Sequence, residues 1–265
     1  MRVPKVVFSI FFAFVLTISL SAQQTTTPSL QALTLLQRSL NALSGGQSLA
    51  DATLSGTARR IAGSDDETGT VVLKALSAGA SRMDLSLPSG QRSEIWNAVG
   101  DAPVGTWSGP DGISHPISNH NLMTDSAWFF PALTISRLVT LQTNVVSYVG
   151  QETKDGLLLN HLTAFQQFSG LPTKAVSQQQ HLSQMEIFLD PSTFLPVALA
   201  FNIHPDNDAS LDIPAEVRFS DYRPVNGIQI PFHVQKYLNN TLILDLQFQT
   251  SVLNSGLSTS AFQVQ

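Results

Sequence analysis

The sequence predicts an α+β protein that is mostly antiparallel β-sheet, with an N-terminal helix and a short helical insert. Two observations carry this prediction. The hydrophobic pattern alternates with a period of two over most of the chain after residue 49, and dipeptides typical of tight hairpins separate the alternating segments. Charge is also low, since only 12% of residues are charged and Ser, Thr, Gln and Asn supply the polar surface. We expect about 10–11 strands, which form a curved sheet or an incomplete β-barrel.

The predicted N-terminal helix covers residues 29–43. Thr27, Pro28 and Ser29 provide a cap and a proline near the first turn, and Gly45-Gly46 ends the helix. Five leucines recur at spacings of three and four, namely Leu30, Leu33, Leu36, Leu40 and Leu43. This spacing places the leucines along one face, which we expect to cover one side of the sheet.

The middle of the chain interrupts the alternation. Residues 121–141 have apolar spacings that favour one or two short helices. Hairpins follow, with Asp155-Gly156 and Asn226-Gly227 supplying the positive φ angles that tight turns require. Two of the strands predicted in this part span residues 181–189 and 196–204.

The first residues have the pattern of a secretory signal peptide. A basic start containing Arg2 and Lys5 precedes an apolar run over residues 6–20, which is too short to cross a bilayer comfortably as a helix. Small residues then favour cleavage after Ser21 or Ala22. We therefore predict that residues 1–22 are a signal peptide and that the protein is exported to a periplasm or to the outside of the cell.

The rest of the chain is predicted to be one domain. Residues 23–28 are polar and expected to be disordered, and residues 29–265 contain no low-complexity linker and no repeat. No second long apolar run is present, so no transmembrane span is expected in the mature chain. An uncleaved N-terminal anchor is the alternative to cleavage.

The charge balance argues against nucleic-acid binding. Removal of residues 1–22 takes away Arg2 and Lys5 and no acidic residue, so the formal net charge goes from −5 to −7. Phosphate binding needs a basic stripe, and the sequence has none. The chain also contains no cysteine, which excludes thiol chemistry and a bacterial lipoprotein anchor.

Three segments resemble the LolA/LolB-like periplasmic lipoprotein carriers and receptors. Residues 186–196 are similar to the strand, Asp-Pro turn and Leu-Pro restart of that family. Residues 222–231, centred on Asn-Gly, are also similar to that family, and residues 253–257 followed by Ala261-Phe262 fit it as well. The order of a signal peptide, an amphipathic helix that ends at Gly45-Gly46 and then strands is a further point of resemblance. The resemblance implies a half-barrel wrapped around helices, with an apolar cavity for acyl chains. This chain lacks the lipobox cysteine of the anchored receptors.

The resemblance also implies an arginine at the mouth of the cavity. Four arginines are candidates for that role, because they are expected on the early strands: Arg59, Arg60, Arg82 and Arg92.

Motifs for metal binding and catalysis fail on inspection. Residues 206–212 place oxygen ligands at alternate positions like a calcium loop, but Leu211 stands where glycine is needed and Val217 where a glutamate is needed. The histidines have no metal-ligand spacing, and those expected on or beside separate strands are His161, His181, His204 and His233. No nucleophile elbow or phosphate loop is present. We therefore expect no metal, no cofactor and no enzymatic activity.

Aromatic and apolar side chains are the candidate ligand-binding residues. Trp128, Phe129 and Phe130 lie together in the non-sheet insert, and ordinary core packing is the alternative role for them. The remaining candidates lie on predicted strands and are Trp96, Trp107, Leu199 and Phe201.

Three functional hypotheses follow. The first is an exported envelope protein that binds a lipid, an acyl chain or another apolar ligand, including a lipidated protein, inside the half-barrel. The second is a non-enzymatic envelope interaction module whose half-barrel is filled by its own helices. The third, with less support, is a secreted hydrolase whose carboxylates meet only in the fold.

Overall fold

The computed structural model describes residues 29–97, 103–124, 126–167 and 172–263. The predicted signal peptide and the predicted disordered segment lie outside the described residues. In chain order the elements, with η for 3₁₀ helices, are α1 (Leu30–Ser44), β1 (Asp51–Ala62), β2 (Asp65–Leu76), β3 (Ala80–Leu87), β4 (Gly90–Asn97), β5 (Val104–Ser108), β6 (Ser114–Pro116), η1 (Asn121–Met123), α2 (Pro131–Thr140), β7 (Asn144–Lys154), β8 (Leu157–Gln166), α3 (Thr173–Leu182), β9 (Met185–Leu189), β10 (Pro196–Ile203), β11 (Ile213–Val225), β12 (Ile228–Leu238), β13 (Thr241–Leu253) and η2 (Thr259–Phe262).

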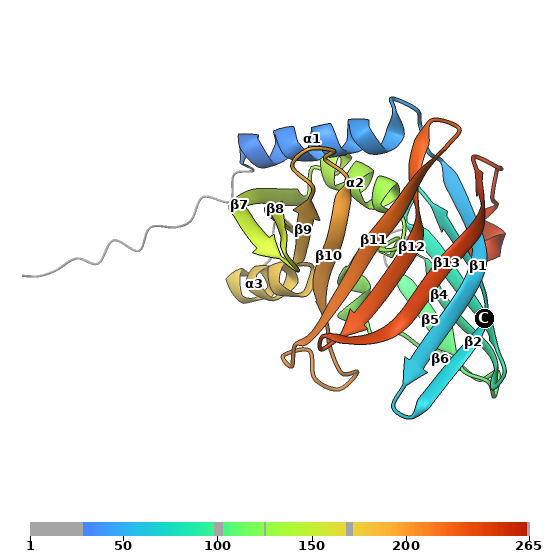
Figure 1. The fold of residues 1–265 in the computed structure, drawn as a ribbon. Helices are drawn as coiled ribbons and strands as arrows, with labels where there is room; N and C mark the ends of the chain where they lie inside the picture. The colour runs from blue at the N-terminus through green and yellow to red at the C-terminus, as the bar shows by residue number, and fades with distance from the viewer. Residues whose placement is uncertain (1–28, 98–102, 125, 168–171, 264–265) are drawn as a thin grey trace, which may run out of the picture.

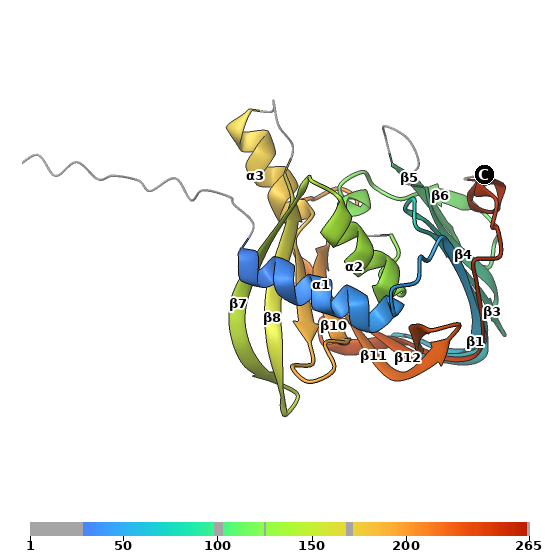
Figure 2. The same ribbon diagram turned by 90° about the horizontal axis from the view of Figure 1, so that it is seen from above.

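All strands belong to one antiparallel sheet of 13 strands in the order β6-β5-β4-β3-β2-β1-β13-β12-β11-β10-β9-β8-β7 (Figure 1). In the described chain β6 and β7 form the two free edges, so the sheet is open and not a closed barrel. Seen from above, it curves around α1 and α2, which lie on its concave side (Figure 2). The predicted α+β class and incomplete barrel are confirmed.

Two details differ from the sequence prediction. The sheet has 13 strands, which is more than the 10–11 expected. The bounds of β1 were not predicted, although Arg59 and Arg60 were expected on early strands, because its Ala, Gly, Ser and Thr residues carry little hydrophobic alternation. The strand predicted from residue 181 begins at Met185, because the preceding residues form α3. This helix is polar, so its hydrophobic period is too weak to identify it from the sequence.

The N-terminal helix has the predicted ends. The Ser29 hydroxyl accepts a hydrogen bond from the backbone N–H of Ala32 at 3.4 Å, and Gly45 adopts a left-handed φ of 57°. Leu36 and Leu43 are fully buried in the main core, whereas Leu30 is 80% exposed. None of the described helices is long and apolar enough to cross a membrane.

The core occupies the concave side of the sheet. Inward residues of the central strands, such as Val217 on β11 and Val234 on β12, pack with α1 and with the segment before α2. That segment contains Trp128, Phe129 and Phe130, which are 2%, 2% and 0% exposed. The insert therefore fills part of the half-barrel with its own side chains.

Candidate functional site: a hollow beside strands β4 and β5

Three adjoining cavities lie along the inner face of β4 and β5. The first has a volume of about 300 Å³, and it shares Trp96 and Thr124 with a second cavity of about 250 Å³. The second shares Glu94 and Trp107 with a third cavity, also of about 250 Å³. We call these three cavities together the β4–β5 hollow. Small-molecule sites have volumes of about 300–1,000 Å³, so the first cavity by itself reaches the lower end of that range.

Strand alternation explains why these side chains meet. Glu94 on β4 lies opposite Met83 on β3 and Trp107 on β5, so all three project from the same face of the sheet. Trp96, two residues after Glu94, shares that face and donates a hydrogen bond from Nε1 to Glu94 Oε1 at 2.9 Å. From across the concave side, Trp128 completes the wall of the second cavity.

The hollow contains more cationic than anionic side chains. The three cavities are lined by the cations Arg60, Arg92, Arg137 and Lys236, and by the acids Glu94 and Asp206. The chain as a whole has a formal net charge of −5, so the hollow has the opposite sign. Such a reversal favours a ligand that carries a negative charge.

Three of these cations are incompletely paired. Arg60 Nη1 and Arg92 Nε are buried without a hydrogen-bond partner in the described structure. The Lys236 ammonium lies 4.3 Å from the centroid of the Trp128 ring. Burial lowers the pKa of Lys236, and the charge of Glu94 opposes this shift.

The structure places four of the seven candidate ligand-binding residues in the wall of the hollow: Trp96, Trp107, Trp128 and Phe201. The other three line none of its cavities. Phe129 and Phe130 pack in the main core, and Leu199 is fully buried against neighbouring strands. Phe129 and Phe130 therefore have the core-packing role that was the alternative for the aromatic insert, and Leu199 is also a core residue.

Of the four arginines proposed for the mouth of a cavity, Arg60 and Arg92 line the third cavity, whereas Arg59 and Arg82 line none of the three. Sequence reasoning missed the other charged residues of the hollow, although one signal was present. On β12 the inward positions include Val234 and Lys236, so a lysine occurs in an otherwise apolar series. A charged residue at an inward strand position indicates either a paired ion or a solvated cavity.

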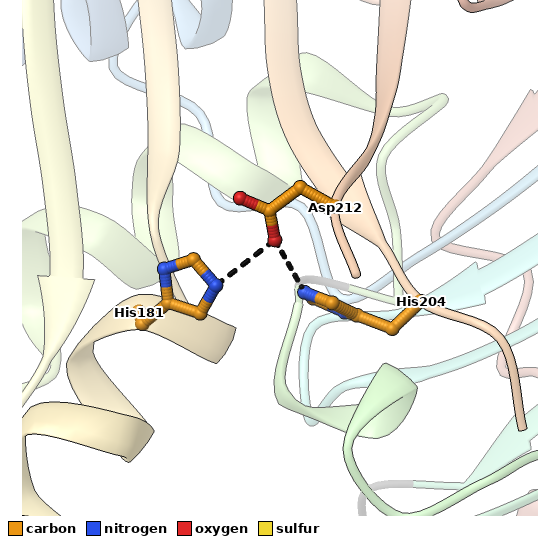
Figure 3. Close-up of side chains that lie close together, drawn as sticks. All are labelled: His181, His204 and Asp212. Carbon is orange, nitrogen blue, oxygen red and sulfur yellow. Dashed lines mark hydrogen bonds and ion pairs between the residues drawn. The ribbon is translucent and has the colours of Figure 1, made fainter. Parts of the chain in front are cut away.

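A second cluster lies at the rim of the hollow, where three side chains from separate elements converge (Figure 3). His181 at the end of α3 and His204 after β10 both direct Nε2 at Asp212 Oδ1, at 2.9 Å and 3.0 Å. Asn121, which lines the second cavity, fixes the His204 backbone by donating to its carbonyl at 2.8 Å and accepting from its N–H at 2.9 Å. Burial lowers the pKa of His204, although its hydrogen bond to Asp212 acts in the opposite direction.

A third cluster has the hydrogen-bond order of a Ser–His–Asp triad. Ser220 Oγ lies 3.1 Å from His233 Nδ1, and His233 Nε2 lies 2.9 Å from Asp245 Oδ1. The three residues lie on neighbouring strands at outward positions, where polar side chains of adjacent strands regularly meet. Ser220 is exposed and lines none of the three cavities of the hollow. In the described structure, the arrangement therefore lies on the outward face of the sheet, apart from the cavities of the hollow.

Comparison with solved structures places this geometry in a known architecture. An outer membrane lipoprotein-sorting protein domain from Vibrio parahaemolyticus matches with a TM-score of 0.55 and 11% identity, over 88% of this chain and 96% of that one. A LolA superfamily protein from Nitrosomonas europaea matches with a TM-score of 0.54 and 10% identity, over 88% and 97%. The chain has a LolA-like fold.

A DUF1329 family protein from Desulfovibrio piger shares the LolA-like fold, with a TM-score of 0.57 and 14% identity, over 90% of this chain and 100% of that one. No protein-family model and no curated protein matches the sequence. In this chain, the LolA-like fold combines a core filled by α1 and the insert with a hollow beside β4 and β5.

Proposed function

We propose that this chain is an exported envelope protein that binds an amphiphile with an acyl chain and an anionic group in the β4–β5 hollow. The observation that carries the proposal is the hollow itself, three adjoining cavities of about 300, 250 and 250 Å³ on the concave face. No catalytic group is needed, because transfer of the chain out of water supplies the affinity.

The apolar part of the proposal rests on the aromatic wall. Trp96 and Trp107 border the hollow with apolar rings, and the largely buried Trp128 and Phe201 form its floor together with Ile203. Burial of each CH₂ group contributes about 0.8 kcal/mol, so two further methylenes add about 1.6 kcal/mol, or slightly more than tenfold in affinity. Affinity should therefore rise with chain length until the hollow is filled.

The anionic part rests on the incompletely paired cations. A carboxylate or phosphate in the hollow would accept hydrogen bonds from Lys236 or from the buried nitrogens of Arg60 and Arg92. Glu94 occupies the same region and keeps the net charge modest, which suits a ligand with a single negative charge.

Export and a carrier role are the remaining parts of the proposal. The signal-peptide pattern of residues 1–22 supports export. The similar structures include a lipoprotein-sorting domain and a LolA superfamily protein, which supports a role in carrying a lipid or a lipidated protein. The mature chain would then act between membranes without spanning one.

The test is native mass spectrometry of the purified protein, followed by calorimetric titration with dodecanoate and hexadecanoate. Val104→Trp places an indole beside the first cavity, where Val104 is 48% exposed. Val149→Trp is the matched control, because Val149 is 56% exposed on edge strand β7 and lines none of the three cavities.

We expect a bound adduct of lipid mass, tighter binding of hexadecanoate than of dodecanoate, and a loss of at least tenfold in Val104→Trp alone. A bare protein mass that persists after incubation with lipid extract, together with no heat of binding, would contradict the proposal. Equal losses in both variants would show that the effect does not come from the hollow.

The second candidate function is an envelope interaction module. It is favoured by the β7–β8 hairpin at the free edge of the sheet, where three large apolar side chains, Val149, Leu157 and Leu158, are 56%, 54% and 53% exposed. An absence of ligand in the experiment above would favour this candidate.

A further inference from the structure

We propose that His181, His204 and Asp212 form a binding site for a divalent transition metal, with Zn²⁺ the ion that best fits the donor set. The inference is independent of ligand binding in the hollow. It rests on the convergence of two imidazoles and one carboxylate, which come from α3, from the segment after β10 and from the residue before β11 (Figure 3).

The distances suit a single small ion. The two imidazole nitrogens and the carboxylate oxygen all lie within 4.8 Å of one another. Tetrahedral Zn²⁺ with bonds of about 2.0–2.1 Å separates its ligand atoms by about 3.3–3.4 Å. The two nitrogen-to-oxygen distances, 2.9 Å and 3.0 Å, therefore need to open by only a few tenths of an ångström.

The donor chemistry also fits. Two imidazoles and one carboxylate form a three-ligand set that Zn²⁺ accepts, with a fourth position left for water. A carboxylate only accepts hydrogen bonds, so both Nε2 atoms carry protons toward Asp212 in the metal-free state. On metal binding each neutral ring shifts its proton to Nδ1 and offers Nε2 to the ion.

Burial of His204 is a second, independent observation. Its side chain is only 1% exposed, and its Nδ1 has no hydrogen-bond partner in the described part of the chain. One nitrogen of this buried imidazole is therefore without a partner in the described structure, while Nε2 is directed at the cluster. His181 and Asp212 are 43% and 40% exposed, which gives an ion from solvent access to the site.

A fourth histidine borders the cluster but is not assigned as a ligand. The His120 ring lies 5.8 Å from the His204 ring, centroid to centroid, and its Nε2 is 3.0 Å from the carbonyl oxygen of Pro205. The proposed site would join α3 to the β10–β11 connection at the rim of the hollow.

The experiment is calorimetric titration of chelator-treated, tag-free protein with ZnCl₂, with Co²⁺ as a spectroscopic probe. We expect one Zn²⁺ per chain and the visible absorption band of tetrahedral Co²⁺. His181→Asn and Asp212→Asn should each weaken Zn²⁺ binding by at least about tenfold. Both replaced side chains are substantially exposed, so these variants should fold, and circular dichroism checks that they do.

His115→Asn is the control, because His115 lies on edge strand β6 and stacks on Trp107 with ring centroids 4.4 Å apart. Its Zn²⁺ affinity should stay within about twofold of the unmodified protein. Absence of saturable Zn²⁺ binding would overturn the proposal. So would stoichiometric binding that persists unchanged in both His181→Asn and Asp212→Asn.

Discussion

Replacement of Lys236 by methionine tests whether the hollow recognises a negative charge. Lys236 projects from the inward face of β12 into the second cavity, and in the described structure it makes no ion pair. Methionine keeps the apolar stem and removes the ammonium, so the change isolates the charge.

The structure sets the expected magnitude. A hydrogen bond to a charged group contributes about 1.5–3 kcal/mol, so loss of the ammonium should weaken hexadecanoate binding about 10- to 100-fold. Hexadecanol has the same chain and no charge, and its binding should change by less than about threefold. Loss of the cation–π contact with Trp128 lowers the stability of the folded protein by about 0.5–2 kcal/mol. Removal of a buried charge raises the stability and offsets this loss.

The pH dependence has a definite sign. Burial lowers the pKa of Lys236, so its charged form is lost at a lower pH than for a lysine in water. Hexadecanoate binding should therefore be strongest below this lowered pKa and weaken as the pH rises through it. The binding of hexadecanol should show no such dependence.

The assay is calorimetric titration of the protein, Lys236→Met and the control Lys174→Met with both ligands. Lys174 is exposed on α3 and lines none of the three cavities. If Lys236→Met binds hexadecanoate within threefold of the unmodified protein, the reasoning that places the negative charge at Lys236 is refuted. An equal loss for the alcohol would instead indicate damage to the apolar wall.

Three further predictions concern the fold and the alternative functions. Burial of Asp51 opposes its ionisation, but hydrogen bonds from Ser255, Gly256 and Leu257 outweigh burial and lower its pKa below the usual 3.8. Asp51→Asn should therefore lower the free energy of unfolding, measured with urea at pH 7, by about 1.5–3 kcal/mol. The difference from the unmodified protein should shrink below about pH 4, because the Asp51 carboxylate is then protonated. Leu199→Ala should lower the free energy of unfolding by about 2–5 kcal/mol and leave the hexadecanoate affinity unchanged, because Leu199 packs in the core. Weaker binding by a folded variant would instead place Leu199 in the ligand site. Ser220→Ala should leave the background hydrolysis of p-nitrophenyl acetate unchanged, whereas a hundredfold fall would restore the hydrolase hypothesis.

Much of the local structure is predictable because its causes are local. The Ser29 cap and the Gly45 terminus define α1 from neighbouring residues alone. The hairpin turn at Asn226 and Gly227 has φ angles of 51° and 83°, as its dipeptide requires. Strand β1 and helix α3 were harder to identify, because small or polar residues leave too little hydrophobic contrast.

The candidate sites depend on contacts between residues far apart in the sequence. Alternation shows which face of its strand each of Leu199 and Trp96 occupies. It does not show that Leu199 packs in the main core whereas Trp96 borders a cavity. His181 and Asp212 are 31 residues apart and share no motif, so only the path of α3, β10 and β11 brings them together.

The sequence by itself determined the helix, most of the hairpins and the alternating faces of the strands, and the export signal stays a prediction from the sequence. These follow from hydrophobic period, turn chemistry and composition, which act over a few residues. Only the tertiary structure decided where the half-barrel is filled and where it is hollow, and which histidines meet a carboxylate. Curvature of the sheet and the packing of α1 and the insert set those distances, and neither is encoded in any single segment.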